Sequence, residues 1–171
     1  MCKNFTISLF FIHLIPGLAQ VSQNYDIVIY GGNSSGVAAA IQASRMGKKV
    51  VLLEPTNRIG GLTTGGLGQT DIGNKQAIGG ISREFYQNVK KYYQNPGNWK
   101  FQKKENYKDG GQTTSDINED AMWTFEPSAA LKILKEMLAK ELKITLEYGQ
   151  RLDRVNGVKK FKGKIVSVKM E

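Results

Sequence analysis

Two short apolar runs flank a helical pattern near the start of the chain. Residues 26–30 are mostly β-branched and are followed by two glycines, and a second run, residues 50–53, is followed by Glu54. Between them, residues 34–46 are rich in alanine and are followed by Gly47, a residue typical of helix C-termini. Short apolar runs bounded by turns are typical of buried parallel strands, so the pattern predicts a βαβ unit of about 30 residues.

Two more helices are predicted after the βαβ unit. Residues 58–80 form a loop rich in glycine and threonine, and residues 81–93 then show a helical pattern with Phe85 and Val89 on one face. A further helix is expected from Pro127 to about residue 141, because proline suits the first helical turn. Its apolar positions are Leu131, Leu134, Leu138 and Leu142.

Three strands are expected after this last helix. Residues 143–148 predict one strand, and residues 151–161 and 164–170 predict an antiparallel pair with turns at residues 156–157 and 162–163. Residues 95–120 are polar and irregular, which predicts an insertion on the surface.

Residues 1–19 have the pattern of a secretory signal peptide. Lys3 supplies the positive charge, residues 5–15 form a short apolar run, and residues 17–19 place small residues at the cleavage positions. The alternative, a membrane anchor, is disfavoured because the run is too short to span and is broken by Pro16 and Gly17. The expected mature protein is periplasmic or secreted and has no stable membrane span.

Cleavage of this leader would change the available chemistry. Cys2 and His13 are the only cysteine and histidine, so the mature chain would have no disulfide, no zinc site of the Cys/His type and no flavin linked through histidine. No metal site is expected. The net charge of +9 would fall to +8 with the loss of Lys3. The basic residues are scattered, which favours a solvated surface over a nucleic-acid site.

Residues 31–36, GGNSSG, match the dinucleotide motif G-x-G-x-x-G at its first and third glycines. Gly31 would allow the tight turn from strand to helix, and Gly36 would let the helix approach the strand closely. The helix N-terminus would then present amide groups to a pyrophosphate. Asn33 takes the place of the second glycine; asparagine tolerates a positive φ better than most residues, but its side chain must point away from the phosphates.

The residues after this turn favour FAD over NAD. Glu54 lies 18 residues past Gly36, at the end of the second strand, where a carboxylate accepts hydrogen bonds from a ribose diol. A second glycine-rich segment, residues 58–66, follows where an NAD domain would continue with another crossover. Such a loop suits a ligand that extends past the first helix. An NAD-binding module, a flexible glycine loop and an unrelated α/β protein with a glycine turn are the alternatives.

Residues 26–54, 60–73, 79–86 and 123–127 resemble FAD-dependent oxidoreductases of the glutathione-reductase-like flavoprotein fold. The resemblance implies an α/β, Rossmann-like FAD-binding domain over residues 25–171, with a βαβ unit and an antiparallel β-meander. Members of the family continue with a further core strand and a substrate domain, so the chain is expected to be truncated.

The resemblance also implies which residues hold the cofactor. Glu54 would bind the adenosine ribose, and Leu152 would contact the adenine through its backbone. The full set implied is Gly31, Gly32, Asn33, Ser34, Ser35, Gly36, Glu54, Arg58, Gly60, Gly61, Thr64 and Leu152.

The leading functional hypothesis is a redox enzyme in which a flavin accepts a hydride or electrons from a small organic substrate. The alternative is a non-catalytic, truncated nucleotide-binding module. No residue is assigned as catalytic. Arg83, Glu84, Tyr86 and Trp123 are polar or aromatic and lie near the matching segments, but surface or packing roles are favoured for each.

Overall fold

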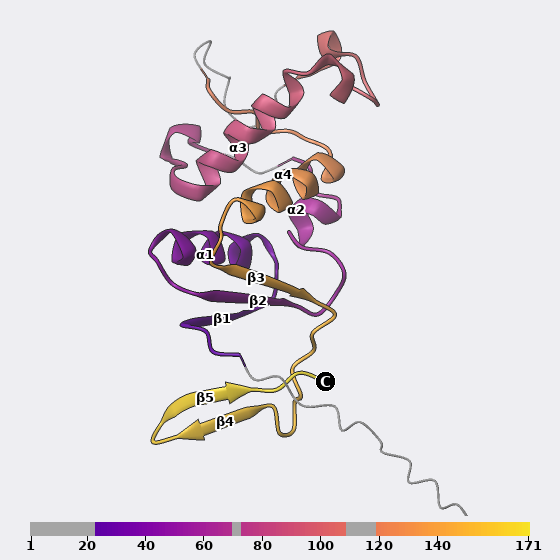
Figure 1. The fold of residues 1–171 in the computed structure, drawn as a ribbon. Helices are drawn as coiled ribbons and strands as arrows, with labels where there is room; N and C mark the ends of the chain where they lie inside the picture. The colour runs from indigo at the N-terminus through magenta and orange to yellow at the C-terminus, as the bar shows by residue number, and fades with distance from the viewer. Residues whose placement is uncertain (1–22, 70–72, 109–118) are drawn as a thin grey trace, which may run out of the picture.

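The chain folds into a helical layer on one face of a small parallel sheet, with a β-hairpin on the other face (Figure 1). This computed structural model describes residues 23–69, 73–108 and 119–171. The predicted βαβ unit is present as β1 (Ile27–Tyr30), α1 (Ser34–Arg45) and β2 (Val50–Glu54). The two strands are parallel, with Ile27 opposite Val50 and Tyr30 opposite Leu53.

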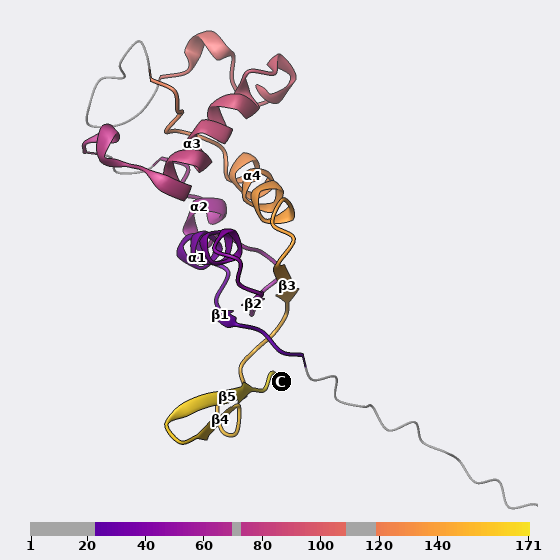
Figure 2. The ribbon, with the colours of Figure 1, turned by 60° about the vertical axis from the view of Figure 1, so that its left-hand side comes forward.

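The helices lie together above the sheet (Figure 2). They are α1, α2 (Leu62–Gly65), α3 (Gly80–Tyr93) and α4 (Pro127–Ala139). Helix α4 begins with Pro127 in its first turn, as the sequence predicts. Its buried face includes Leu134 and Leu138, but Leu142 is 98% exposed, because the helix has already ended at Ala139. The expectation that Leu142 extends the apolar face was therefore wrong.

Strand β3 (Ile144–Tyr148) completes the sheet by pairing in parallel with β2, so that the order is β1-β2-β3. Every residue of the central strand β2 is buried. Strand β1, by contrast, lies at an edge, and Val28 and Tyr30 are 45% and 50% exposed. The prediction of a buried strand was wrong for this face of β1, because the helices cover only the face that carries Ile27 and Ile29.

An aromatic cluster joins α3 to the segment before α4. Trp123 is fully buried, and its ring centroid lies 4.4 Å from that of Tyr86. Phe85 meets Phe125 edge to face at 5.3 Å. Edge-to-face and tilted pairs of this kind add to the stability of the buried area itself. These contacts fix the position of the residues that lead into α4.

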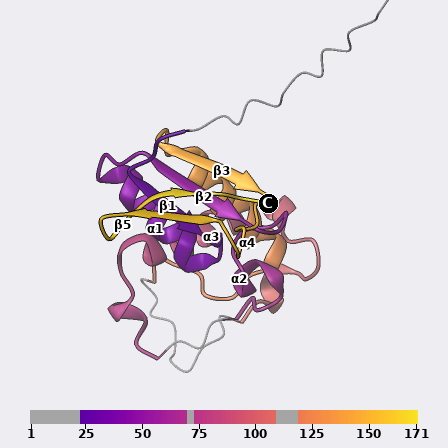
Figure 3. The same cartoon turned by 90° about the horizontal axis from the view of Figure 1, so that it is seen from below.

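The hairpin of β4 (Val158–Phe161) and β5 (Lys164–Val168) lies on the side of the sheet opposite the helices (Figure 1 and Figure 3). Lys162 and Gly163, with φ of 47° and 79°, form the predicted two-residue turn. The first strand of the predicted pair is shorter than expected. Asp153 accepts hydrogen bonds from the amides of Val155 and Asn156, so the turn expected at residues 156–157 begins earlier, at residue 154, and regular strand starts only at Val158.

The predicted insertion, residues 95–120, is described up to residue 108 and from residue 119. Part of it packs on the core: the Trp99 ring lies 4.9 Å from that of Tyr93 and 5.5 Å from that of Tyr107. The predicted signal peptide, residues 1–19, lies outside the described residues. Among the helices that the structure describes, none has the length and apolar character needed to cross a bilayer.

Candidate cofactor site

The glycine turn lies where β1 leads into α1, at the carboxyl ends of the parallel strands. Gly31 has φ of 106°, and a Cβ added to it would meet no atom within 4 Å. The turn therefore needs glycine for its backbone conformation and borders open space. In open α/β sheets, ligands bind at this end of the strands.

Gly36 brings α1 into direct contact with the turn. A Cβ added to Gly36 would lie 2.0 Å from the carbonyl oxygen of Gly31, and a Cβ on Gly32 would lie 3.0 Å from both a Glu54 oxygen and Ile59. The first of these contacts is with backbone, which has no rotamer to change. The prediction of close helix packing at Gly36 thus has a clear physical basis.

Asn33 acts as the N-cap of α1. Its φ is −68°, so its backbone is extended, and the positive φ of the turn belongs to Gly31. The expectation that Asn33 is accommodated by tolerating a positive φ was therefore wrong. Its Oδ1 accepts hydrogen bonds from the Gly36 amide at 2.9 Å and from the Ser35 hydroxyl at 2.8 Å. A side-chain cap of this kind satisfies an amide that has no partner within the helix.

Glu54 is buried at the end of β2, with 7% of its surface exposed. Its Oε2 accepts the Gly32 amide at 2.7 Å, and its Oε1 accepts the amide and the hydroxyl of Thr56 at 2.8 and 2.7 Å. Burial favours a raised pKa for Glu54, but the hydrogen bonds from Thr56 and Gly32 outweigh it and lower the pKa below its ordinary value. The carboxylate is therefore charged at neutral pH and ties the first strand to the second.

The second glycine loop lies against the first. The amide of Gly60 donates to the carbonyl of Gly32 at 2.6 Å, and Asn33 and Gly60 form a parallel bridge. The Ser34 hydroxyl donates to the carbonyl of Gly60 at 2.9 Å and lies 2.7 Å from the hydroxyl of Thr63. Two segments that are far apart in sequence thus form one continuous surface at the N-terminus of α1.

Two residues expected to line the cofactor path serve the loop itself. Thr64 has no exposed surface, and its hydroxyl donates to the carbonyl of Ile59 at 2.5 Å. The expectation that Thr64 lines the path is corrected: a residue without accessible surface stabilises the loop from inside. Arg58 donates through Nε to the carbonyl of Thr64 at 3.0 Å and through Nη2 to the same oxygen. Its guanidinium thus caps the end of the short helix α2.

Leu152 lies beside the end of β1. Its amide is 3.3 Å from the hydroxyl of Tyr30, to which it donates, and the residue forms an isolated antiparallel bridge with Met170. A backbone contact to an adenine at this amide would compete with Tyr30.

Sequence reasoning missed the roles of Tyr30 and of Thr56, although a threonine two residues after a strand-terminal carboxylate is a recognisable hydrogen-bonding pattern.

The four residues named near the matching segments lie away from this surface. Arg83 donates to the carbonyl of Lys75 at 3.1 Å and to Glu119 at 2.8 Å, while Glu84 pairs with Arg45. Tyr86 and Trp123 are buried in the aromatic cluster. Arg83 and Glu84 thus form ion pairs between segments, and the rings of Tyr86 and Trp123 pack against each other.

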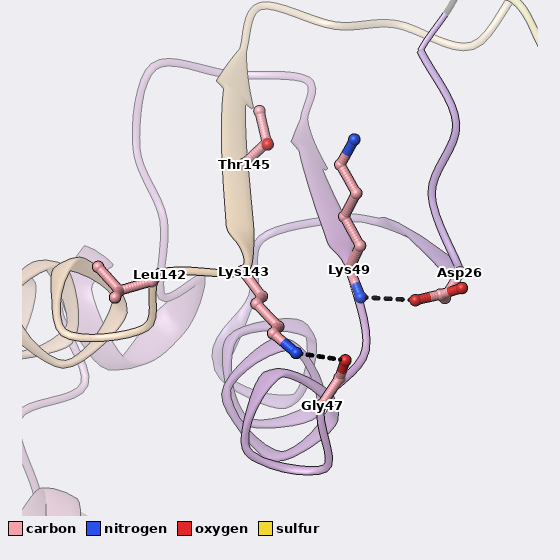
Figure 4. A pocket seen from close by; sticks show the side chains of 6 residues that line it. All are labelled: Asp26, Gly47, Lys49, Leu142, Lys143 and Thr145. Atoms are coloured by element: carbon pink, nitrogen blue, oxygen red, sulfur yellow. Dashed lines mark hydrogen bonds between the residues drawn. The ribbon is translucent and has the colours of Figure 1, made fainter.

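A hollow of about 330 Å³ lies at the other end of the sheet, near the N-terminal ends of the strands (Figure 4). It is lined by Asp26, Gly47, Lys49, Leu142, Lys143 and Thr145. The ammonium group of Lys143 donates to the carbonyl of Gly47 at 2.8 Å, and Asp26 accepts the amide of Lys49 at 2.8 Å. These contacts tie together the starts of the strands.

In the residues with described positions, no cluster of three His, Cys, Asp or Glu side chains could hold a metal ion.

The sequence from residue 26 to residue 171 matches the profile of the family described as FAD dependent oxidoreductase. The chain belongs to this family. Its cofactor is accordingly FAD, and the expected glutathione-reductase-like relationship is confirmed by a curated relative. Glutathione reductase of Schizosaccharomyces pombe is 41% identical over 44 residues, which make up 26% of this chain and 10% of the relative.

Two solved structures resemble this member of the family in fold. PqsL of Pseudomonas aeruginosa, described as a probable FAD-dependent monooxygenase, has a TM-score of 0.51 at 14% identity, covering 85% of this chain and 38% of PqsL. THI4 of Thermovibrio ammonificans has a TM-score of 0.47 at 15% identity, covering 85% and 46%. The chain thus spans less than half the length of these proteins. The Rossmann-like α/β fold is confirmed.

The groups at the carboxyl ends of the parallel strands fit FAD. Gly31, Gly65 and Gly66 border open space, since a Cβ on any of them would meet no atom within 4 Å. The amides of Ser34 and Ser35 belong to the first turn of α1 and have no carbonyl partner within the helix. Helix N-terminal amides that have no carbonyl partner within the helix suit the pyrophosphate, and the charged Glu54 suits a ribose diol.

Proposed function

We propose that the chain is the FAD-binding part of an enzyme that transfers a hydride or electrons from a small organic molecule to the flavin. One arrangement carries this proposal: the two glycine loops are hydrogen-bonded to each other beside the buried carboxylate of Glu54. A ligand that extends from Glu54 along both loops is longer than a single phosphate group. FAD meets that requirement, with a nucleoside at one end and a ring system at the other.

In this proposal, the adenosine ribose binds Glu54 and the pyrophosphate binds the N-terminal amides of α1. Gly31, Gly32 and Gly36 allow the backbone to approach the phosphates, and Ser35 supplies a hydroxyl. The remainder of the cofactor then follows Gly60 and Gly61. Flavin supplies the acceptor for a hydride or electrons, and the residues of this chain bind and orient it.

Thr56 controls how many acceptor positions Glu54 offers to a ribose. A carboxylate accepts about four hydrogen bonds, and the Glu54 carboxylate already accepts three, from Gly32 and Thr56. The Thr56 hydroxyl also lies 3.1 Å from the carbonyl of Arg58 and can donate to it instead. We propose that this hydroxyl turns to Arg58 when FAD binds, which leaves Glu54 two acceptor positions for the two ribose hydroxyls.

A second candidate function is a nucleotide-binding module without turnover. Its support is that the contacts of the two glycine loops and Glu54 account for nucleotide binding without a catalytic group. In either case we propose export, with cleavage after Ala19, on the basis of residues 1–19. The expected N-terminus of the exported protein is Gln20, which mass spectrometry of the periplasmic or secreted fraction would test.

Titration of the purified protein with FAD, followed by flavin fluorescence and calorimetry, tests the binding proposal. Saturable binding of one FAD that excess NAD does not displace would support it, whereas tighter binding of NAD would overturn it. The flavin should leave with the supernatant when the protein is denatured, since the mature chain has no cysteine or histidine to attach it. Anaerobic bleaching of the bound flavin by an oxidisable organic substrate would then distinguish the enzyme from the non-catalytic module.

A further inference from the structure

The hairpin β4–β5 carries an unusual concentration of positive charge. Residues 158–169 contain five lysines and no acidic residue. Lys169 pairs with Asp153 at 3.3 Å. Across the described residues, no carboxylate lies within ion-pair distance of the other four, Lys159, Lys160, Lys162 and Lys164.

The same hairpin exposes large apolar side chains. Phe161 is 64% exposed, Ile165 62% and Val166 54%, although they belong to β-strands. All residues from 158 to 167 are exposed. A two-stranded ribbon is at best marginally stable alone in water, and apolar side chains gathered at one place mark an interaction site.

Lysines and apolar side chains alternate on both faces of this ribbon. Lys160 is opposite Ile165 on one face, and Phe161 is opposite Lys164 on the other, with the Lys162 ammonium 5.5 Å from the Phe161 ring. A protein surface covering either face would have to bury ammonium groups, which is unfavourable unless each finds a carboxylate. A lipid surface accepts both kinds of side chain, because lysine stems lie along apolar surface while their charged ends remain in water.

We infer that hairpin β4–β5 docks on the surface of an anionic lipid bilayer. The face that carries Lys159, Phe161 and Lys164 lies on the lipid, so that these lysines meet the lipid phosphates and Phe161 enters the boundary between headgroups and acyl chains. Each lysine close to such a surface contributes about a fivefold gain in binding. Nucleic acid fits less well, because single-stranded sites rely on several stacking aromatic residues and this hairpin has only Phe161.

Sedimentation with vesicles tests this inference independently of the flavin. The protein should bind vesicles of equal phosphatidylcholine and phosphatidylglycerol, should not bind phosphatidylcholine alone, and should be released by salt. Reversing four charges, Lys159→Glu, Lys160→Glu, Lys162→Glu and Lys164→Glu, should weaken binding by about a hundredfold or more. The matched control reverses four exposed lysines elsewhere, Lys100→Glu, Lys103→Glu, Lys104→Glu and Lys108→Glu, and should retain most of the binding.

Two further variants cover the case in which the fourfold reversal disturbs the hairpin. Phe161→Ser should weaken vesicle binding by about tenfold, as expected for one phenyl ring returned to water. Lys162→Gln with Lys164→Gln should weaken it by about fivefold per lysine. Equal binding to neutral vesicles, equal losses in the hairpin and control variants, or binding to an oligonucleotide in place of vesicles would each overturn the inference.

Discussion

The two glycine loops of the cofactor site have different tolerances for a side chain. In the first, a Cβ on Gly36 would lie 2.0 Å from the backbone oxygen of Gly31. In the second, a Cβ on Gly60 would lie 2.1 Å from the side-chain methyl of Thr64. Backbone in a strand-to-helix turn cannot move away without displacing the helix, whereas a side chain can be shortened by substitution. The first loop therefore sets the helix position, whereas the second is limited by side-chain contacts and by the positive φ of Gly60.

The largest effect is expected for Gly36→Ala. The new methyl group must push α1 away from the turn, which costs about 1–3 kcal/mol in packing and moves the amides that would hold the pyrophosphate. We expect FAD affinity to fall by more than a hundredfold, measured by flavin fluorescence, with the helical circular dichroism retained. Gly79→Ala is the matched control, because its Cβ would meet no atom within 4 Å, its φ of −129° suits any residue, and it lies outside the cofactor site, so it should bind FAD normally. Normal binding by Gly36→Ala would show that the pyrophosphate lies elsewhere.

Glu54→Gln tests the carboxylate beside the first loop. The loss of charge-assisted hydrogen bonds, each worth about 1.5–3 kcal/mol, should weaken FAD binding by about ten- to a hundredfold. The variant also tests the pH dependence of unfolding. Because the folded pKa of Glu54 lies below its ordinary value, its contribution to stability is complete above the unfolded pKa and is lost as the pH falls through the folded pKa. Denaturant titrations below pH 5 should show a smaller loss of stability for Glu54→Gln than for wild type.

A moderate effect is expected for Gly60→Ala in the second loop. Alanine at its φ of 94° is strained by about 1–2 kcal/mol, and the new methyl group also meets Thr64. Adding Thr64→Ser removes the methyl group of Thr64 but keeps its hydroxyl bond to Ile59, so the double variant should recover part of the lost free energy of unfolding. A double-mutant cycle in urea measures this coupling. Strictly additive losses would mean that the crowding at Thr64 contributes nothing.

The smallest effect is expected for Asn33→Gly. Replacing an asparagine N-cap by glycine costs only a few tenths of a kcal/mol, and it releases the Gly36 amide that Asn33 now holds. FAD affinity should therefore stay the same or rise slightly, by calorimetry, with a small decrease in melting temperature. A clear loss of FAD from a folded Asn33→Gly protein would show that the amide side chain itself contacts the cofactor.

Several elements of the site could be predicted because they depend on short stretches of sequence. The apolar runs before Gly31 and Glu54 are enough to indicate two strands, and the glycine spacing indicates a turn between strand and helix. The end of the chain was less predictable. Asp153 closes a turn by bonding the amides of Val155 and Asn156, and this local hydrogen bonding competes with the strand pattern around it.

The sequence alone determined the βαβ unit, the position of Glu54 at the end of the second strand and the family with its cofactor, since each rests on residue types at fixed short spacings. Tertiary structure decided which groups meet across long separations. Only the folded chain brings Gly60 against Gly32, buries Thr64 and leaves one face of β1 exposed. Periodicity specifies which face of an element is apolar, but its neighbours decide whether that face is covered.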